Sequence, residues 1–276
     1  MTSNPLLPRL AKVVRIVPET ADVKTFVLEI EGAPLNHLPG QFVELSVFGT
    51  GEAPFCVASS PTREGTIECS IKRMGAVTQA LHRLLPGATI GVRGPYGNRF
   101  PLDAMEGAGL LFIGGGIGMA PLRPAIQFCL DRREKYGEIE ILSGARTPDE
   151  LVYQNELEEW AKAPRTKVTL TVDPGGEKPG WAGKVGLVPK ILEEMRPRPR
   201  TTFAITCGPP IMIKYTLLAL SRLGFAEEKV YTTLEMKMTC GIGKCGRCNI
   251  GRFYICKDGP VFNLKTLKEI GAETHL

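Results

Sequence analysis

Alternation between apolar and polar residues marks the N-terminal part of the chain. Residues 24–30, 42–47 and 66–72 alternate at strand length, as segments with one buried face do. Turn signals such as Pro39-Gly40 separate them, and only a short helix, 77–85, is expected among them. Short strands in one block predict an all-β domain, a small closed barrel, over residues 1–103.

The pattern changes after Pro101, where short apolar runs alternate with helical stretches. Strands are expected at 109–113, 138–142, 167–172 and 202–207, and helices at 122–135, 150–163, 187–195 and 210–223. This alternation predicts a doubly wound α/β domain over residues 104–228. A small C-terminal lobe would then occupy residues 229–276.

Composition and charge narrow the class of protein. The 276 residues suffice for two domains and a lobe, and 43% hydrophobic residues supply their cores. The net charge of +5 is too mild to argue for nucleic acid, and no apolar stretch approaches the ~20 residues of a membrane helix. Residues 1–9 lack the features of a signal peptide. We therefore expect a cytoplasmic protein that binds neither nucleic acid nor membrane.

A cysteine cluster near the C-terminus carries the strongest chemical signal. The spacing is C-x4-C-x2-C-x7-C, and its members, the predicted metal ligands, are Cys240, Cys245, Cys248 and Cys256. The first three have the spacing of plant-type [2Fe–2S] ferredoxins. Structural zinc is the main alternative, although zinc ribbons usually offer two C-x2-C knuckles and only one is present here. Disulfides are a further alternative, which the absence of any export signal disfavours.

A glycine-rich turn follows the first α/β strand and predicts a nucleotide site. Glycines there let a diphosphate approach backbone amides at a helix N-terminus. The candidate residues in this turn are Gly115, Gly116, Gly118, Met119, Ala120 and Pro121. Gly208 and Pro209 end a neighbouring strand, and Arg146 follows another, where it could contact a ribose or a 2′-phosphate. A plain strand–helix turn and a solvated arginine are the alternatives, and NAD and NADP are not separated.

These motifs together resemble the ferredoxin–NADP reductase superfamily. The order of β domain, glycine-rich α/β domain, Cys207-Gly-Pro-Pro and cysteine lobe is similar to the branch that holds the electron-transfer subunit of dihydroorotate dehydrogenase. Within that branch, residues 244–251 and 256–262 look most like the gamma subunits of NiFe sulfhydrogenases and the flavin subunit of anaerobic sulfite reductase. The resemblance spans residues 10–264.

The resemblance implies FAD in the β domain, NAD(P)H in the α/β domain, and a catalytic Cys207. The segments matching the flavin motifs contribute Pro54, Phe55, Cys56, Val57 and Ser59, followed by Ile71, Lys72, Gly75, Ala76, Val77 and Thr78. The family's flavin-binding arginine is replaced by Ala53. Ordinary strand packing is the alternative role for Phe55 and Cys56.

Electron counting supports the same set of cofactors. A nicotinamide exchanges two electrons as hydride, an iron–sulfur cluster exchanges one, and a flavin can do both. We therefore expect a diaphorase subunit that passes electrons between NAD(P)H, FAD, a [2Fe–2S] cluster and a partner subunit, with a NiFe hydrogenase favoured. Dihydroorotate dehydrogenase, sulfite reductase and heterodisulfide-reductase-type partners, a free-standing reductase, and a non-catalytic redox sensor are the alternatives.

The residues between Met236 and Lys257 include basic side chains but no acidic ones. The basic residues are Lys237, Lys244, Arg247, Arg252 and Lys257. They could raise the potential of a cluster or dock an acidic partner, or they could simply belong to a solvated loop.

Overall fold

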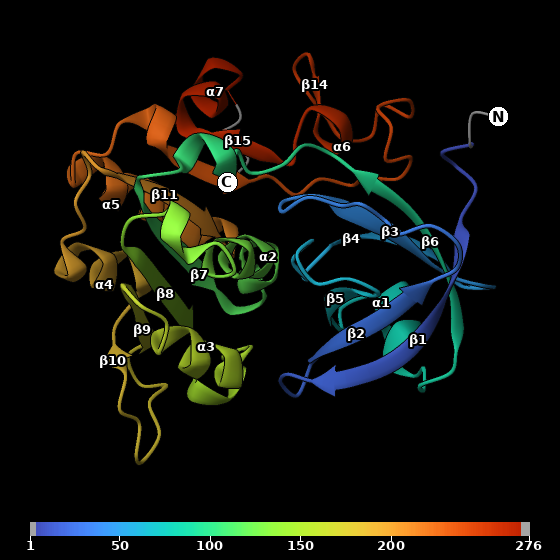
Figure 1. Cartoon of the computed structure of the whole chain (residues 1–276), viewed down its shortest axis with the longest axis horizontal. Helices are drawn as coiled ribbons and strands as arrows, with labels where there is room; N and C mark the ends of the chain where they lie inside the picture. The colour runs from blue at the N-terminus through green and yellow to red at the C-terminus, as the bar shows by residue number, and fades with distance from the viewer. Residues whose placement is uncertain (1–3, 272–276) are drawn as a thin grey trace.

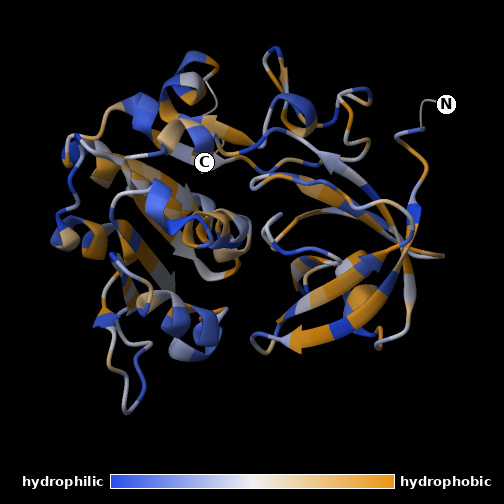
Figure 2. Ribbon diagram, in the orientation of Figure 1, coloured by the Kyte–Doolittle hydropathy of each residue, from blue (hydrophilic) through white to orange (hydrophobic). Residues whose placement is uncertain are grey.

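The computed structural model describes residues 4–271. An antiparallel sheet and a parallel sheet lie side by side, and the C-terminal segment runs along one end of both (Figure 1). Apolar residues concentrate on the strands of both sheets, whereas the loops are mostly polar (Figure 2).

The N-terminal sheet is antiparallel, with strand order β4-β3-β6-β1-β2-β5. Its elements are β1 (Arg9–Pro18), β2 (Val23–Ile30), β3 (Phe42–Val47), β4 (Gly51–Cys56), β5 (Ile67–Lys72), α1 (Ala76–His82) and β6 (Thr89–Tyr96). The all-β prediction is confirmed, but within residues 4–271 no ladder pairs β4 with β5, so the expected closure is absent. Pro54 lies in the edge strand β4, where a residue without an amide donor is tolerated.

The two faces of β3 have different partners. Val43 and Leu45 point into the core of the N-terminal domain. Phe42, on the alternate face, packs instead with residues of the C-terminal lobe. The C-terminal lobe therefore packs against the outer face of this sheet.

The second domain is a doubly wound α/β sheet, as predicted, with strand order β10-β9-β8-β7-β11-β12-β15. The strands are β7 (Gly109–Gly115), β8 (Ile139–Ala145), β9 (Thr166–Val172), β10 (Lys184–Val185), β11 (Thr202–Cys207), β12 (Val230–Thr233) and β15 (Val261–Asn263). The main helices are α2 (Met119–Leu130), α3 (Gln154–Ala161), α4 (Val188–Met195) and α5 (Pro210–Arg222). Helices α2 and α3 cover one face, and α4 and α5 cover the other.

The cysteine lobe is built into both domains. Its small elements are β13 (Asn249–Ile250), β14 (Phe253–Tyr254), α6 (Ile255–Asp258) and α7 (Leu264–Glu269). Its strand β15 pairs antiparallel with β12 and so completes the α/β sheet. No helix within residues 4–271 is long and apolar enough to span a bilayer.

Candidate functional site: three junctions around the N-terminal domain

The glycine-rich turn after β7 meets the end of β11 at the carboxyl edge of the parallel sheet. Gly114 stands opposite Cys207 in the β7–β11 pairing. A Cβ on Gly118 would lie 2.5 Å from both the Cys207 carbonyl oxygen and Gly208 Cα, so only glycine allows this approach. Gly116 has φ +54°, in the left-handed region that glycine adopts without strain. The two predicted nucleotide loops are therefore one continuous edge, suited to a diphosphate.

The side chains of the other nucleotide candidates are buried or half-buried, exposed to solvent, or paired with another residue. Met119 and Ala120 are buried in the domain core, so only their backbone faces the turn. Pro121 is half-buried within the first turn of α2, and Pro209 is exposed just before α5. Arg146 is exposed and donates from Nε to Glu150 Oε2 at 2.8 Å. The predicted ribose or 2′-phosphate contact of Arg146 stays a prediction.

The predicted flavin residues lie on the unpaired edge strands β4 and β5 and just beyond them. Val57 and Ile71 are buried in the core of the N-terminal domain, and Phe55 packs partly against it. Ser59 is also buried, and its Oγ accepts a hydrogen bond from the Glu68 amide at 3.0 Å. Cys56 alone of this set packs against the core of the α/β domain. It therefore marks the line along which the two domains meet.

The loop from Lys72 to Thr78 presents backbone rather than side chains. The Thr78 hydroxyl accepts from the Met74 and Gly75 amides, both at 2.8 Å, and donates to the Gly75 carbonyl at 3.0 Å. Lys72 Nζ lies 3.4 Å from Asp22. Gly75 and Ala76 are exposed, and Val77 and Thr78 follow in the first turn of α1, whose amides lack intrahelical partners.

These residues offer FAD mainly backbone amides rather than charged side chains. Strands β4 and β5 are the two edges of the N-terminal sheet, and the first turn of α1 offers amides to a diphosphate. Ala53 supplies no cation, and Lys72 already faces a carboxylate. Arg73, which is exposed and belongs to no ion pair within residues 4–271, is the nearest free cation in the sequence. The backbone amides and Arg73 together therefore fit the diphosphate of a bound FAD.

Two thiols and one carboxylate converge at the junction between the domains. The Cys207 Sγ lies 3.0 Å from Thr233 Oγ1, and burial raises its pKa to about 12. Burial also raises the pKa of Cys56, and the neighbouring Cys69, Cys207 and Glu235 add to this effect. Both thiols are therefore neutral at neutral pH, and Glu235 is the acidic residue near them.

Glu235 was not among the sequence candidates. It follows β12 and Leu234, at the carboxyl edge of the sheet where ligand loops gather. An acidic residue directly after a short apolar strand is the signal that could have identified it.

A buried arginine fixes the two domains to one another. Arg123 on α2 donates from Nη1 to Glu68 Oε2 of β5 at 2.5 Å, and from Nη2 to Glu156 Oε1 of α3 at 2.6 Å. Its Nη1 also reaches the Ala58 carbonyl at 2.8 Å, and its guanidinium lies 4.9 Å from the centre of the Tyr153 ring. Because Glu68 and Ala58 belong to the N-terminal domain, this one side chain ties the flavin side to the nucleotide side.

The four lobe cysteines lie close to one another. Cys240 interacts with Cys245, and Cys256 interacts with both Cys248 and Cys240. Burial opposes ionisation of Cys240, but the amides of residues 242, 244 and 245 outweigh it and lower its pKa to about 6. Burial raises the pKa of Cys256 to about 12, although the Gly243 amide donates to its Sγ at 3.1 Å.

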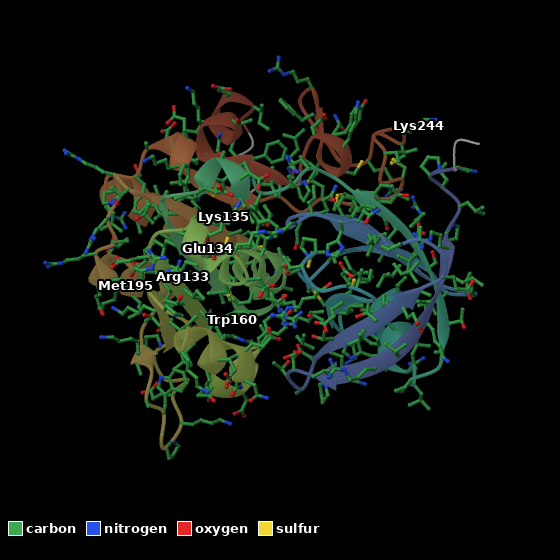
Figure 3. All side chains as sticks on the ribbon, in the orientation of Figure 1. Arg133, Glu134, Lys135, Trp160, Met195 and Lys244 are labelled. Atoms are coloured by element: carbon green, nitrogen blue, oxygen red, sulfur yellow. The ribbon has the colours of Figure 1, made fainter. Side chains whose placement is uncertain are left out.

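The outer end of the cysteine loop faces solvent. Cys248 and Cys256 are buried, Cys240 is half-buried and Cys245 is exposed. Figure 3 shows Lys244 projecting at this end, away from the nucleotide domain. All eight cysteines, each within residues 4–271, are free thiols. No three potential ligands in that range converge on a point suited to a single metal ion.

The lobe is held against the N-terminal domain by the turn after β6. Asn98 Nδ2 donates to the Asp258 and Val261 carbonyls, each at 2.8 Å, and Asn98 Oδ1 accepts from the Val261 amide at 2.9 Å. A Cβ on Gly241 would lie 2.6 Å from the Tyr96 ring, so the cysteine loop rests directly on that ring.

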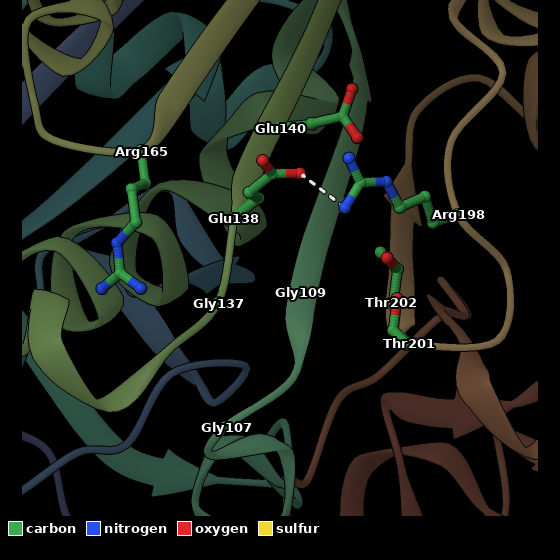
Figure 4. Close-up of a pocket in the computed structure, with 9 residues that line it drawn as sticks. All are labelled: Gly107, Gly109, Gly137, Glu138, Glu140, Arg165, Arg198, Thr201 and Thr202. Atoms are coloured by element: carbon green, nitrogen blue, oxygen red, sulfur yellow. Dashed lines mark ion pairs between the residues drawn. The ribbon is translucent and has the colours of Figure 1, made fainter.

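A shallow groove lies at the opposite, amino edge of the parallel sheet (Figure 4). Arg198 reaches across it, and its Nη1 lies 3.9 Å from Glu138 Oε2. Gly109 and Thr202, which begin β7 and β11, also line it. The groove is therefore separate from the predicted nucleotide edge.

Comparisons with known proteins define the class. Three family models match in order: the oxidoreductase FAD-binding domain at residues 10–100, the oxidoreductase NAD-binding domain at 112–217, and the iron–sulfur cluster binding domain of dihydroorotate dehydrogenase B at 235–268. The protein is thus an oxidoreductase with FAD-, NAD- and iron–sulfur-binding domains, as its motifs suggested.

The chain belongs to the family that includes sulfhydrogenase gamma subunits and the electron transfer subunits of dihydroorotate dehydrogenase B. Sulfhydrogenase 1 subunit gamma of Pyrococcus furiosus is 42% identical over 94% of this chain and 91% of that protein. A probable dihydroorotate dehydrogenase B (NAD(+)) electron transfer subunit of Methanocaldococcus jannaschii is 34% identical, covering 96% of this chain and 94% of that protein. A solved NADH-dependent reduced ferredoxin-NADP oxidoreductase has a TM-score of 0.76 at 27% identity and covers 99% of this chain and 95% of its own.

Proposed function

We propose that the chain is the NAD(P)H-linked diaphorase subunit of a larger cytoplasmic redox complex. Its three units, residues 1–103, 104–228 and 229–276, would bind FAD, NAD(P)H and a [2Fe–2S] cluster, respectively. The main support for this proposal is that the N-terminal domain contacts the α/β domain through Cys56 and the cysteine loop through Tyr96. A flavin seated there would lie between the nucleotide edge and the cysteine loop.

In this proposal the chain positions groups rather than reacting with them. Bound FAD supplies the exchange between hydride and single electrons. The amides of the glycine-rich turn orient the dinucleotide, and neutral Cys207 lines the nicotinamide side without placing a charge there. Glu235 stands beside the two thiols and places a carboxyl group at that junction, where we assign it the proton exchange. Arg123 keeps the two domains in register while hydride crosses.

The spacing of the cysteines supports a two-iron cluster over zinc. A [2Fe–2S] core with four thiolates gives each iron two cysteines, whereas one zinc ion needs all four around a single point. Within residues 4–271 no three potential ligands converge on one point, and only Cys245 and Cys248 have the C-x2-C spacing typical of zinc knuckles.

A hydrogenase-type partner is favoured by the higher identity to a sulfhydrogenase gamma subunit, 42% against 34% for the dihydroorotate dehydrogenase B subunit. A dihydroorotate dehydrogenase partner is the second candidate, since several relatives carry that name. Copurification from the native cell distinguishes them: a nickel-containing subunit supports the first, and a flavoprotein that oxidises dihydroorotate supports the second.

Anaerobic spectroscopy of the purified chain tests the subunit's own role. We expect flavin absorbance, iron and acid-labile sulfide, and bleaching by NADH or NADPH, whichever it uses. Zinc without iron and sulfide would refute the electron-transfer role. A flavin-free protein that neither nucleotide reduces would instead support a redox sensor.

A further inference from the structure

A single buried cation lies directly beneath the cysteine loop. Arg93 of β6 has a side chain that is only 6% exposed. Its Nη1 donates to the Cys240 carbonyl and its Nη2 to the Thr239 carbonyl, both at 2.7 Å. The guanidinium thus holds the segment that carries the first cysteine of the cluster.

The same guanidinium is fixed from the side of the N-terminal domain. Its Nε donates to Glu52 Oε2 of β4 at 2.8 Å, and its Nη2 also pairs with Glu52 Oε1. Its Nη1 lies 3.2 Å from the hydroxyl of Tyr96, whose ring supports Gly241. With partners on three sides, Arg93 cannot move away from the loop without breaking several hydrogen bonds.

Glu44 adds a second carboxyl group to this buried layer. It stands opposite Arg93 in the β3–β6 pairing and is 1% exposed. Its Oε1 is buried and has no hydrogen-bond partner. The layer under the loop therefore contains one cation with a carboxyl group on each of two neighbouring strands.

Burial gives Arg93 more influence on the loop than the exposed cations around it have. Lys244, Arg247 and Lys257 are all exposed and form no ion pair within residues 4–271. Exposed charges are screened by water and salt, whereas a buried charge is screened far less. An electrostatic effect on a cluster held by this loop should therefore come mainly from Arg93.

We propose that Arg93 is a positioning residue that raises the reduction potential of the cluster, with Glu52 as the opposing charge. This inference rests on the proposed function, since it requires a cluster on the four cysteines. An added electron makes the cluster more negative, so a nearby fixed cation stabilises the reduced form and a nearby anion destabilises it. The two charges should thus act with opposite sign.

An EPR-monitored redox titration of the cofactor-loaded full chain tests this sign. Arg93→Met should lower the potential by a shift equivalent to about tenfold in the equilibrium constant, ~59 mV for a one-electron couple. Arg93→Lys keeps the positive charge, so its reduction potential should stay close to that of the wild type. Glu52→Gln should move the potential upward. Arg247→Met, at an exposed position beside Cys248, is the matched control and should change it several-fold less.

The outcomes separate this inference from the proposed function. Wild-type protein without iron and sulfide would refute the cluster itself. Equal iron and sulfide in all variants, with Arg93→Met and Glu52→Gln shifting the potential in one direction or not at all, would show that Arg93 is only structural. If Arg93→Met loses the cluster, the upward shift of Glu52→Gln relative to wild type and a near-normal potential for Arg93→Lys still support the proposal, and their absence refutes it.

Discussion

Replacing Arg123 by methionine should separate stability from chemistry at the domain junction. The substitution removes a guanidinium that bonds two carboxylates and one carbonyl, while it keeps much of the side-chain volume. Glu68 and Glu156 would then face one another without the cation between them. Burial of their side chains, which are 17% and 30% exposed, leaves each only partly hydrated.

The cost follows from this burial. Removing one partner of a buried ion pair typically costs about 3–5 kcal/mol, and partial hydration of Glu156 places Arg123→Met near the lower end, about 3 kcal/mol. At about 2–4 °C per kcal/mol, the expected fall in melting temperature is roughly 6–12 °C. Arg222→Met is the matched control: Arg222 is 60% exposed and pairs with Glu193. An exposed pair of this kind contributes about 0–1 kcal/mol.

Thermal unfolding by circular dichroism, with flavin fluorescence to report FAD release, provides the measurement. Stopped-flow reduction by NAD(P)H at a temperature where both variants are folded gives the second readout. We expect Arg123→Met to slow hydride transfer by roughly tenfold or more with little change in nucleotide affinity, because misalignment acts on the reacting geometry. Equal melting temperatures for Arg123→Met and Arg222→Met would refute the domain-locking role.

Three further substitutions test the remaining parts of the site. Cys245→Ser should remove iron and labile sulfide, measured chemically, while NAD(P)H-driven dye reduction at the flavin persists; loss of both would mean that the lobe supports the flavin site. Glu235→Gln should slow flavin reduction by roughly 100-fold in stopped flow, whereas Glu228→Gln, at an exposed pair with Lys265, should not; equal rates would remove Glu235 from the mechanism. Burial raises the pKa of Glu44 to about 8 despite nearby Arg93. Between about pH 4.5 and 8 the folded state therefore keeps a proton on Glu44 that the unfolded state has lost, so the free energy of unfolding falls as the pH rises through that interval. Glu44→Gln should abolish this slope in urea unfolding measured from pH 4.5 to 8; an unchanged slope would assign it to other groups.

The hydrophobic periodicity and the positions of Gly and Pro in the turns predicted most of the fold. Four of the six parallel strands of the α/β sheet match the expected segments closely, and its four main helices overlap the expected regions; strands β10 and β12 were not predicted. Helix α3 begins at Gln154 rather than 150, because Tyr153 has a left-handed φ of 61° that stops helical continuation. Strand β4 went unpredicted, since Gly51 and Pro54 break the alternation that signals a strand.

The functional site divides in the same way between local and distant signals. The cysteine spacing and the glycine-rich turn are local patterns, so the sequence alone identifies residues 240–256 and 115–121 as candidate sites. Arg93 and Arg123 meet partners 147 and 55 positions away, such as Cys240 and Glu68. No periodicity encodes contacts at such separations, and both arginines pass for ordinary strand and helix residues until the chain is folded.

The two arginines give the N-terminal domain a symmetrical role between its neighbours. Arg123 joins it to the α/β domain through Glu68, and Arg93 joins it to the cysteine loop through Glu52. The two residues share no partner, and free energies at independent sites add within about 0.5 kcal/mol. Arg123→Met should therefore affect the hydride step and Arg93→Met the cluster potential, and the double variant should combine both effects without further change. A cross-effect, in which Arg123→Met shifts the cluster potential, would mean that the domain transmits strain from one junction to the other. The separate hydrogen-bond sets of the two side chains argue against such transmission, so each variant should change only its own readout.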